Sequence, residues 1–411
     1  MNVSSFIANR IAFNQQKSFS RFIIRLSLIA TIISVVVMIV TLSFVNGFKE
    51  KVSEKVFSFW GHIRVSYRQP VKSSIAEEIA ITKNDTVFNN IKKLPQVQTV
   101  HAFATKNAIL KSTDELEGLM LKGLDTTYQV AHFKEFLKEG RWLRFNDSTY
   151  SREIIISEYT AQQLKLKLND KVLIYFFKSD QTIRPDKLTI VGIYKTGIED
   201  YDKNFAIGDM KLIQRLNGWK EAEIGGYEIF LKDYQQMDAV SNAIYNEKDF
   251  PELWETRTIK EIYPNIFDWL GVIDNNGRIL LIIMTIIAGI NFISCLIILV
   301  LERVRMIGIL KAVGASNWTI QRIFLYQSGL ITIVGIVAGT LLALGILFLQ
   351  MKTGFVRLKE AEYYISTAHV KIIWWQVAAV GGGTLLISLL VLLIPSFIVR
   401  RIQPIRALHF R

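Results

Sequence analysis

The side chains that most often carry enzyme chemistry are scattered along this sequence of 411 residues. The five histidines show neither the H-E-x-x-H spacing of a zinc site nor a nucleophile beside them: His62, His101, His132, His369 and His409. Glu199, Asp200 and Asp202 form one acidic cluster, but no histidine accompanies it at metal-ligand spacing. The sequence therefore predicts no catalytic residue and no metal site.

Four apolar segments dominate the chain: 26–48, 279–301, 323–349 and 372–399. Each is long enough to cross a bilayer as a helix. None contains Lys, Arg, Asp or Glu, which argues against an ion-coupled transporter, because such proteins carry ionisable groups in their spans. A cleavable signal peptide is the alternative for 26–48, but its apolar run is too long and no small-x-small site follows. The polar segment 49–278, which is 230 residues long, lies between the first two spans. We therefore predict a membrane protein with one large domain outside the membrane.

Basic residues mark one side of that membrane. The segments 1–25, 302–322 and 400–411 hold twelve basic residues and one acidic residue, a net +11 of the formal +13, within 58 residues. With four spans these segments lie on one side, which the positive-inside rule identifies as the cytoplasm. Both termini are therefore expected in the cytoplasm, with 49–278 outside the bacterial inner membrane. The basicity gives no reason to expect a nucleic acid partner.

The exported segment is expected to form an α+β domain. Short or alternating apolar runs predict strands at 62–67, 97–110, 117–124, 153–157, 171–177, 187–194 and 226–231. Helical spacing fits 76–93, 159–166, 209–216 and 234–246. Because strands from both halves interleave with helices, we predict two subdomains, with residues 115–208 inserted between 49–114 and 209–278.

The most informative segment connects the second and third spans. An apolar stripe of Ile307, Leu310 and 312–313, with basic residues free to face water or lipid headgroups, predicts an amphipathic helix at the membrane surface. Residues 302–316 read ERVRMIGILKAVGAS. They closely resemble the coupling segment of ABC permeases of the FtsX-like and MacB-like superfamily, where an E/K-R-x-x-E-I-G-I-L-K-A-x-G-A-S pattern precedes the third span. Met306 stands where that pattern has an acidic residue, which puts one polar contact to the ATPase in question.

Further stretches extend the resemblance over essentially the whole chain. Residues 394–408, IPSFIVRRIQPIRAL, are similar to the family's P-x-x-x-A-x-R-x-x-P-x-E-A-L-R ending. Residues 7–10 (IANR), 41–48 (TLSFVNGF) and 61–65 (GHIRV) resemble the lipoprotein-releasing LolC and LolE permeases more than the MacB efflux type. The segments 139–142 (EGRW) and 196–202 (TGIEDYD) also match the periplasmic domain of that branch.

This resemblance implies a type VII ABC transporter permease with four transmembrane helices. Its periplasmic domain would have a porter-like part (49–114 and 209–278) and a Sabre-like part (115–208), and residues 350–371 would form a short periplasmic loop. The implied partners are a second permease subunit, identical or different, and LolD-like ATPase subunits. Because the sequence has no G-x-x-x-x-G-K-[ST] phosphate loop, this chain is expected to bind no cofactor, and the ATPase subunits would hold ATP and Mg²⁺. The implied coupling residues are Glu302, Arg303, Arg305, Ile307, Gly308, Leu310, Lys311, Gly314, Ala315 and Ser316.

The implied substrate is an acylated lipoprotein, extracted from the outer leaflet of the inner membrane. Its acyl chains need an apolar cavity open to lipid, since each buried CH₂ is worth about 0.8 kcal/mol. The family forms this cavity between the first and second spans of two permease subunits, and the candidates here are Phe44, Val45, Phe48, Val52, Ile273 and Leu280. Lipid-facing or helix-packing roles are the alternative for each. In the third span, Gly335 and Gly339 predict close helix packing.

Two other functions within the superfamily stay open. The chain would serve either as a MacB-like efflux or mechanotransmission permease, or as an FtsX-like regulator of a cell-wall hydrolase. In LolC-type subunits a β-hairpin hook captures the soluble lipoprotein carrier, and the corresponding connection here, 178–186, is short. The chain is therefore expected either to be a LolE-like partner or to dock a carrier differently.

Overall fold

The computed structural model describes residues 19–69, 78–112, 115–146, 149–177 and 182–391. The chain divides into two compact units. The helical unit comprises residues 1–49, 270–357 and 367–411, and the sheet unit comprises residues 50–269 and 358–366. Helices α2 (Phe19–Trp60) and α9 (Pro264–Glu302) each contribute residues to both units.

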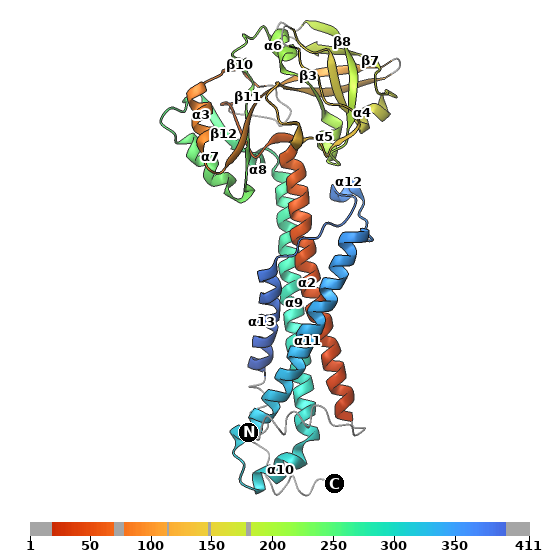
Figure 1. The fold of residues 1–411 in the computed structure, drawn as a ribbon, viewed down its shortest axis with the longest axis vertical. Coiled ribbons are helices and arrows are strands. Elements are labelled where there is room, and N and C mark those ends of the chain that lie inside the picture. Colours follow the sequence, from red (N-terminus) through yellow and green to blue (C-terminus); the bar gives the residue numbers. More distant parts are fainter. Residues whose placement is uncertain (1–18, 70–77, 113–114, 147–148, 178–181, 392–411) are drawn as a thin grey trace. The chain divides into compact units, whose positions relative to one another are not determined.

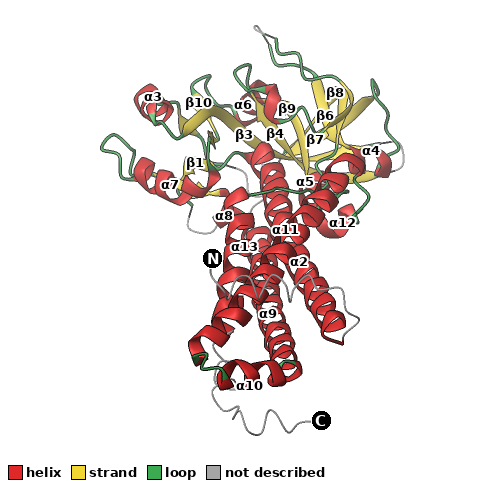
Figure 2. Cartoon of the chain, turned by 60° about the horizontal axis from the view of Figure 1, so that its bottom comes forward, coloured by secondary structure: helices red, strands yellow, loops and turns green. Residues whose placement is uncertain are grey.

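Four helices are long and apolar enough to span a membrane: α2, α9, α11 (Asn317–Thr353) and α13 (Trp374–Val391). They run side by side in the helical unit in both views (Figures 1 and 2). Helices α2, α9 and α11 each contain one predicted span, and α2 continues from the predicted end at residue 48 to Trp60. The part of the fourth predicted span beyond residue 391 lies outside the described residues. A short helix, α10 (Val304–Ala312), separates α9 from α11.

Contacts between α2 and α11 form the core of the helical unit. Val35 and Ile39 of α2 are buried against Ala343 and Leu347 of α11. A Cβ added at Gly339 would lie 3.0 Å from the carbonyl oxygen of Ile32, and one at Gly335 would lie 2.8 Å from the Thr31 side chain. The close packing predicted for this glycine pair is therefore confirmed.

The sheet unit is built on a ten-stranded sheet. Nine strands follow the order β12-β1-β11-β3-β4-β9-β6-β8-β5, and β7 pairs with both β3 and β8. The strands are β1 (Ile63–Tyr67), β3 (Val97–Lys111), β4 (Leu116–Leu124), β5 (Leu137–Gly140), β6 (Glu153–Ser157), β7 (Lys171–Phe177), β8 (Ile183–Tyr194), β9 (Phe205–Asp209), β11 (Gly226–Leu231) and β12 (Trp254–Thr258). Strands β2 (Ile81–Thr82) and β10 (Glu223–Ile224) form a separate pair.

The sheet unit also contains short helices: α3 (Asp85–Lys93), α4 (Glu158–Gln163), α5 (Glu199–Asn204), α6 (Met210–Asn217), α7 (Met237–Tyr245), α8 (Ile259–Ile262) and α12 (Glu360–Tyr363), with 3-10 turns η1 (Val130–His132) and η2 (Tyr234–Gln236). In the sheet, strands from 49–114 and 209–278 stand together (β12, β1, β11, β3), followed by the strands from 115–208. One sheet thus runs through both parts, and their division into two subdomains stays a prediction.

All seven strands expected from the sequence are present, most within a residue of the expected ends. The prediction of a helix at 76–93 is wrong for its first part. Residues 81–82 form β2, and α3 begins at Asp85 because the Asn84 side chain accepts a hydrogen bond from the Val87 amide at 3.2 Å, which caps the helix. Strand β8 begins at Ile183, four residues earlier than expected, so β7 and β8 form a hairpin in which Phe177 pairs with Ile183.

The C-terminal end of α2 lies in the core of the sheet unit. Phe59 stacks on Tyr201 with ring centroids 4.8 Å apart, and Trp60 meets the Phe205 ring edge-on at 4.9 Å. The last turn of α2 contains no basic residue. Lys122 of β4 supplies the positive charge that favours a helix C-terminus, because its Nζ donates to the carbonyl oxygen of Phe59.

Candidate functional site

The segment 302–316 forms a helix followed by a tight turn. Helix α10 ends at Ala312, and the Ala315 amide then donates to the carbonyl oxygen of Leu310 at 2.9 Å. Gly314 has φ +90°, a left-handed conformation that favours glycine. Ser316 begins the next helix, since its side chain accepts a hydrogen bond from the Thr319 amide at 3.2 Å. The turn therefore fixes the position of α10 next to the start of α11.

One face of α10 packs against the ends of the neighbouring long helices. Ile307 is fully buried and contacts Val300 of α9 together with Ile320 and Phe324 of α11. Leu310 and Ala315 are partly buried against the same cluster, and Gly308 is buried. Arg303, between α9 and α10, is half-buried, and partial burial lowers the pKa of Lys311. Part of the predicted apolar stripe is therefore buried against other helices of the same chain.

Three exposed apolar side chains lie on α10 and just after it, and we call them the α10 surface: Ile309 of α10, Val313 in the turn, and Trp318 of α11. Val313 is 83% exposed, although it belongs to the predicted stripe. Trp318 lies at the start of α11, and the Arg322 guanidinium stands 5.3 Å from its ring centroid. Sequence reasoning selected neither Ile309 nor Trp318. The signal for Trp318 was present, since an exposed tryptophan one turn before an arginine forms a cation–π pair on a helix.

The six cavity candidates differ in how far they are buried within the chain. Phe44 packs against the core of the helical unit, and Val45 approaches within 3.0 Å of the position of a Cβ at Gly277 of α9. Phe48 is 9% exposed, and Val52, which belongs to the sheet unit, is fully buried. Ile273 is half-buried and Leu280 is 38% exposed. Of the six, Leu280 is the most accessible to a molecule outside this chain.

Residues 43–47 of α2 hold the segment that leads into α13, a feature that sequence reasoning missed. A Cβ at Gly47 would lie 2.4 Å from the carbonyl oxygen of His369. The Lys371 amide donates to the Ser43 carbonyl oxygen at 3.0 Å, and the Asn46 side-chain amide donates to Gln376 Oε1 at 2.6 Å. Gly47 is therefore a position where two backbones meet too closely for any side chain.

Two buried ion pairs lie in the sheet unit near the end of α2. Lys122 Nζ lies 2.8 Å from Glu228 Oε1, and both side chains are almost fully buried. Burial lowers the pKa of Lys122 to about 8 and raises that of Glu228. Arg64 binds Glu78 at 2.5 Å, and Thr105 donates to the same carboxylate. Because β4, β11 and α2 all contribute to the Lys122 contacts, this network joins the two parts of the sheet to the helix.

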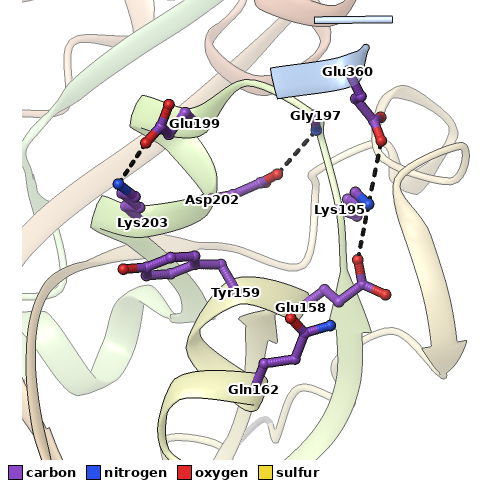
Figure 3. Close-up of a pocket in the computed structure, with 9 residues that line it drawn as sticks. All are labelled: Glu158, Tyr159, Gln162, Lys195, Gly197, Glu199, Asp202, Lys203 and Glu360. Atoms are coloured by element: carbon purple, nitrogen blue, oxygen red, sulfur yellow. Dashed lines mark hydrogen bonds and ion pairs between the residues drawn. The ribbon is translucent and has the colours of Figure 1, made fainter. Parts of the chain in front are cut away.

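A pocket of about 360 Å³ in the sheet unit contains the acidic cluster noted in the sequence (Figure 3). Asp202 accepts hydrogen bonds from the Thr196 amide and hydroxyl and from the Gly197 amide, at 2.8 to 2.9 Å. Its carboxylate is thus occupied by the turn that precedes α5. Within the described residues no three His, Cys, Asp or Glu side chains gather as a metal site. Lys195 bridges Glu158 and Glu360, at 3.0 and 3.2 Å, on the opposite wall.

Two family models match the chain and cover most of it. The MacB-like periplasmic core domain matches residues 26–246, and the FtsX-like permease C-terminal region matches residues 278–404. The chain belongs to this permease family. It is an ABC transporter permease with four membrane-spanning helices and a large α+β domain, as the sequence predicted.

Relatives in the family align over nearly the full length of the chain. The lipoprotein-releasing system transmembrane protein LolC of Neisseria meningitidis is 23% identical over 96% of each chain. The LolE protein of Haemophilus influenzae is also 23% identical, over 99% of each chain. Among solved structures, the extracellular domain of the ABC-type transporter YknZ from Gram-positive bacteria aligns with a TM-score of 0.32 at 17% identity, covering 47% of this chain and 98% of that one.

Proposed function

We propose that this permease extracts lipoproteins from the outer leaflet of the inner membrane, using ATP hydrolysed by a separate subunit. The observation that carries the proposal is the full-length similarity to LolC and LolE proteins, which spans both the exported domain and the helices. In this proposal the chain sits in the inner membrane with cytoplasmic termini and works as a dimer with a second permease subunit. The ATPase subunits are LolD-like and bind ATP and Mg²⁺.

The proposed ATPase contact is the α10 surface. Val313 and Ile309 expose apolar area to solvent, whereas Ile307 fixes α10 to α9 and α11 from the other side. A helix held in this way is suited to docking in a groove of the ATPase subunit, because its apolar face is exposed while its opposite face packs on α9 and α11. Closure of the ATPase pair would then move the ends of the long helices directly. Of the ten implied coupling residues, we assign Ile307, Gly308 and Gly314 to holding the segment in shape.

A lipoprotein carrier, if one takes part, would contact the end of the β7–β8 hairpin. Phe177 and Ile183 pair across this hairpin and are 39% and 57% exposed. Exposed apolar side chains at a hairpin end suit an apolar partner surface. The hairpin is longer than the sequence suggested, because residues 183–186 belong to β8. This length supports carrier docking by the chain itself.

The function is tested by following a lipoprotein out of the membrane. The complex is reconstituted in vesicles with an acylated lipoprotein, ATP and a soluble acceptor, and release is measured by sedimentation. Leu280→Gln places an amide at the accessible cavity candidate, and we expect release to fall while ATP hydrolysis continues, because an unpaired polar group in an acyl-lined site is costly. Ile282→Gln is the matched control, since Ile282 is 60% exposed and lies about 200° around the same helix.

Wild-type complex that hydrolyses ATP but releases no lipoprotein would refute the proposed function and favour the MacB-like or FtsX-like alternatives. Equal release by the Leu280 and Ile282 variants would leave the function standing and remove Leu280 from the substrate path.

A further inference from the structure

A groove in the helical unit lies between α2, α9 and α13, and none of the six cavity candidates lines it. It has a volume of about 320 Å³ and is lined by Met38 and Leu42 of α2, Leu281 and Thr285 of α9, and α13 residues from 375 to 387. Along α13 the lining positions recur three and four residues apart, which places them on one face of the helix. From position 376 to position 387 this face is about 16 Å long. The groove is therefore narrow and runs along the direction of the spans.

Small side chains create the groove. Ala379 and Gly383 line it, and no atom lies within 4 Å of the position of a Cβ at Gly383. Both hydroxyls in the groove already have acceptors within the chain, since Thr384 donates to the carbonyl oxygen of Val380 at 2.7 Å and Thr285 donates to the Met38 sulfur at 3.9 Å. No charged side chain lines it. Its walls therefore offer a ligand hydrocarbon surface.

One end of the groove is polar. Gln376 lines this end, and its Oε1 accepts a hydrogen bond from Asn46. Its Nε2 donates to no residue in the described part of the chain. Trp374 and Trp375 beside it are 68% and 69% exposed, and tryptophan is enriched where a membrane meets water. Lys371, an exposed residue five positions before Gln376, is held next to α2 because its amide donates to the Ser43 carbonyl oxygen at 3.0 Å.

We propose that this groove binds one acyl chain of a bilayer phospholipid, with the lipid headgroup near Gln376. An amphiphile with a polar head and a long apolar tail matches a groove that is polar at one end and apolar along its length. The groove is formed by one chain, so it needs no second subunit for its walls. Phospholipid is the most abundant such amphiphile around membrane-spanning helices. The proposal requires that α2, α9 and α13 span a membrane and is independent of lipoprotein release.

The test compares lipid crosslinking to the wild-type chain with crosslinking to variants whose groove is filled by a larger side chain. The full-length chain, with the subunits that copurify, is placed in nanodiscs of phosphatidylglycerol carrying a diazirine on one acyl chain, and adducts are mapped by mass spectrometry after illumination. We expect adducts on the groove residues of α13 and α9 in the wild-type chain. Gly383→Leu should remove most of them, because its side chain occupies the space of the acyl chain. Ala379→Leu provides a second filled groove at a different level.

Gly382→Leu is the matched control. Gly382 is the neighbouring residue, has no atom within 4 Å of its Cβ position, and is not part of the groove. Adducts should persist in this variant. The proposal is overturned if the wild-type chain gives no groove adducts, if the Gly382 and Gly383 variants lose them equally, or if crosslinks show another permease chain or a lipoprotein acyl chain seated there instead.

Discussion

Lys195 at the end of strand β8 binds Glu360 of helix α12, with Nζ and Oε2 3.2 Å apart. Glu360 belongs to the connection between α11 and α13, yet residues 358–366 are part of the sheet unit. A second lysine, Lys55 of α2, lies 3.7 Å from Glu360 Oε1 and donates to the carbonyl oxygen of Tyr364 at 2.7 Å. Two ion pairs of Glu360 therefore hold the segment that connects α11 to α13 against the rest of the sheet unit.

The first prediction concerns the ion pairs of Glu360. Glu360→Lys places a third positive charge next to Lys55 and Lys195, so we expect residues 358–366 to detach from the sheet unit without unfolding it. Amide hydrogen exchange should rise in 358–366 and stay unchanged in the strands. The reciprocal change Lys195→Glu should partly restore protection in the double variant. Unchanged exchange in Glu360→Lys would show that the buried Ile365 holds the segment without the ion pairs.

The second prediction concerns the buried pair beneath α2. Lys122→Met leaves Glu228 buried without its partner, and breaking a buried pair in this way costs about 3–5 kcal/mol. We expect a correspondingly lower midpoint of chemical unfolding for the sheet unit. The double variant Lys122→Met with Glu228→Leu should recover much of the loss, because no charge is then left unpaired. A double variant as unstable as the single one would show that the Lys122 contact with the Phe59 carbonyl oxygen is what matters.

The third prediction concerns pH. Burial lowers the pKa of both His62 and His101 from the usual 6.5 to about 4. Both histidines are therefore neutral in the folded chain, and their contribution to stability is complete above pH 6.5 and lost as pH falls toward 4. Unfolding followed by tryptophan fluorescence should show this loss. His101→Gln should flatten the pH dependence, while His369→Gln, at an exposed position, should leave it unchanged.

The periodicity of apolar residues predicted the helices and strands of this fold better than the contacts between them. The seven strands were found because apolar residues recur along them, and the spans because they lack charge. Strands β5, β9 and β12 of the sheet were missed: β5 has only four residues, and Glu255 and Arg257 give β12 a polar sequence. The contact of Gly47 with His369 joins residues more than 300 positions apart, and no local pattern encodes it. Similarly, the motif identified the coupling segment, but only packing shows that Ile307 faces inward and Val313 outward.

The fourth prediction separates these two faces of α10. Val313→Asp puts a charge on the α10 surface, where it stays solvated in the isolated chain, so folding should be unaffected. Docking of an ATPase against it should be lost, because the charge would be buried without a partner. Co-purification of the ATPase subunit measures this. Ile307→Ala is the contrasting variant, expected to destabilise the packing of α10 by about 2–5 kcal/mol. Normal ATPase association in Val313→Asp would exclude the α10 surface as the docking site.

The last prediction concerns the contact between α2 and the segment entering α13. Gly47→Ala adds a Cβ where the His369 carbonyl oxygen would be 2.4 Å away, a separation that atoms do not tolerate. Either backbone must move, so we expect the Lys371–Ser43 and Asn46–Gln376 hydrogen bonds to weaken together. Amide hydrogen exchange at Lys371, whose N–H donates to the Ser43 carbonyl oxygen, should then be faster with Gly47→Ala than in the parent chain. Gly345→Ala is the control, since no atom lies within 4 Å of its Cβ position in α11. Equal exchange rates at Lys371 with both alanine substitutions would mean that the segment adapts to the added methyl group and that Gly47 is not required for this contact.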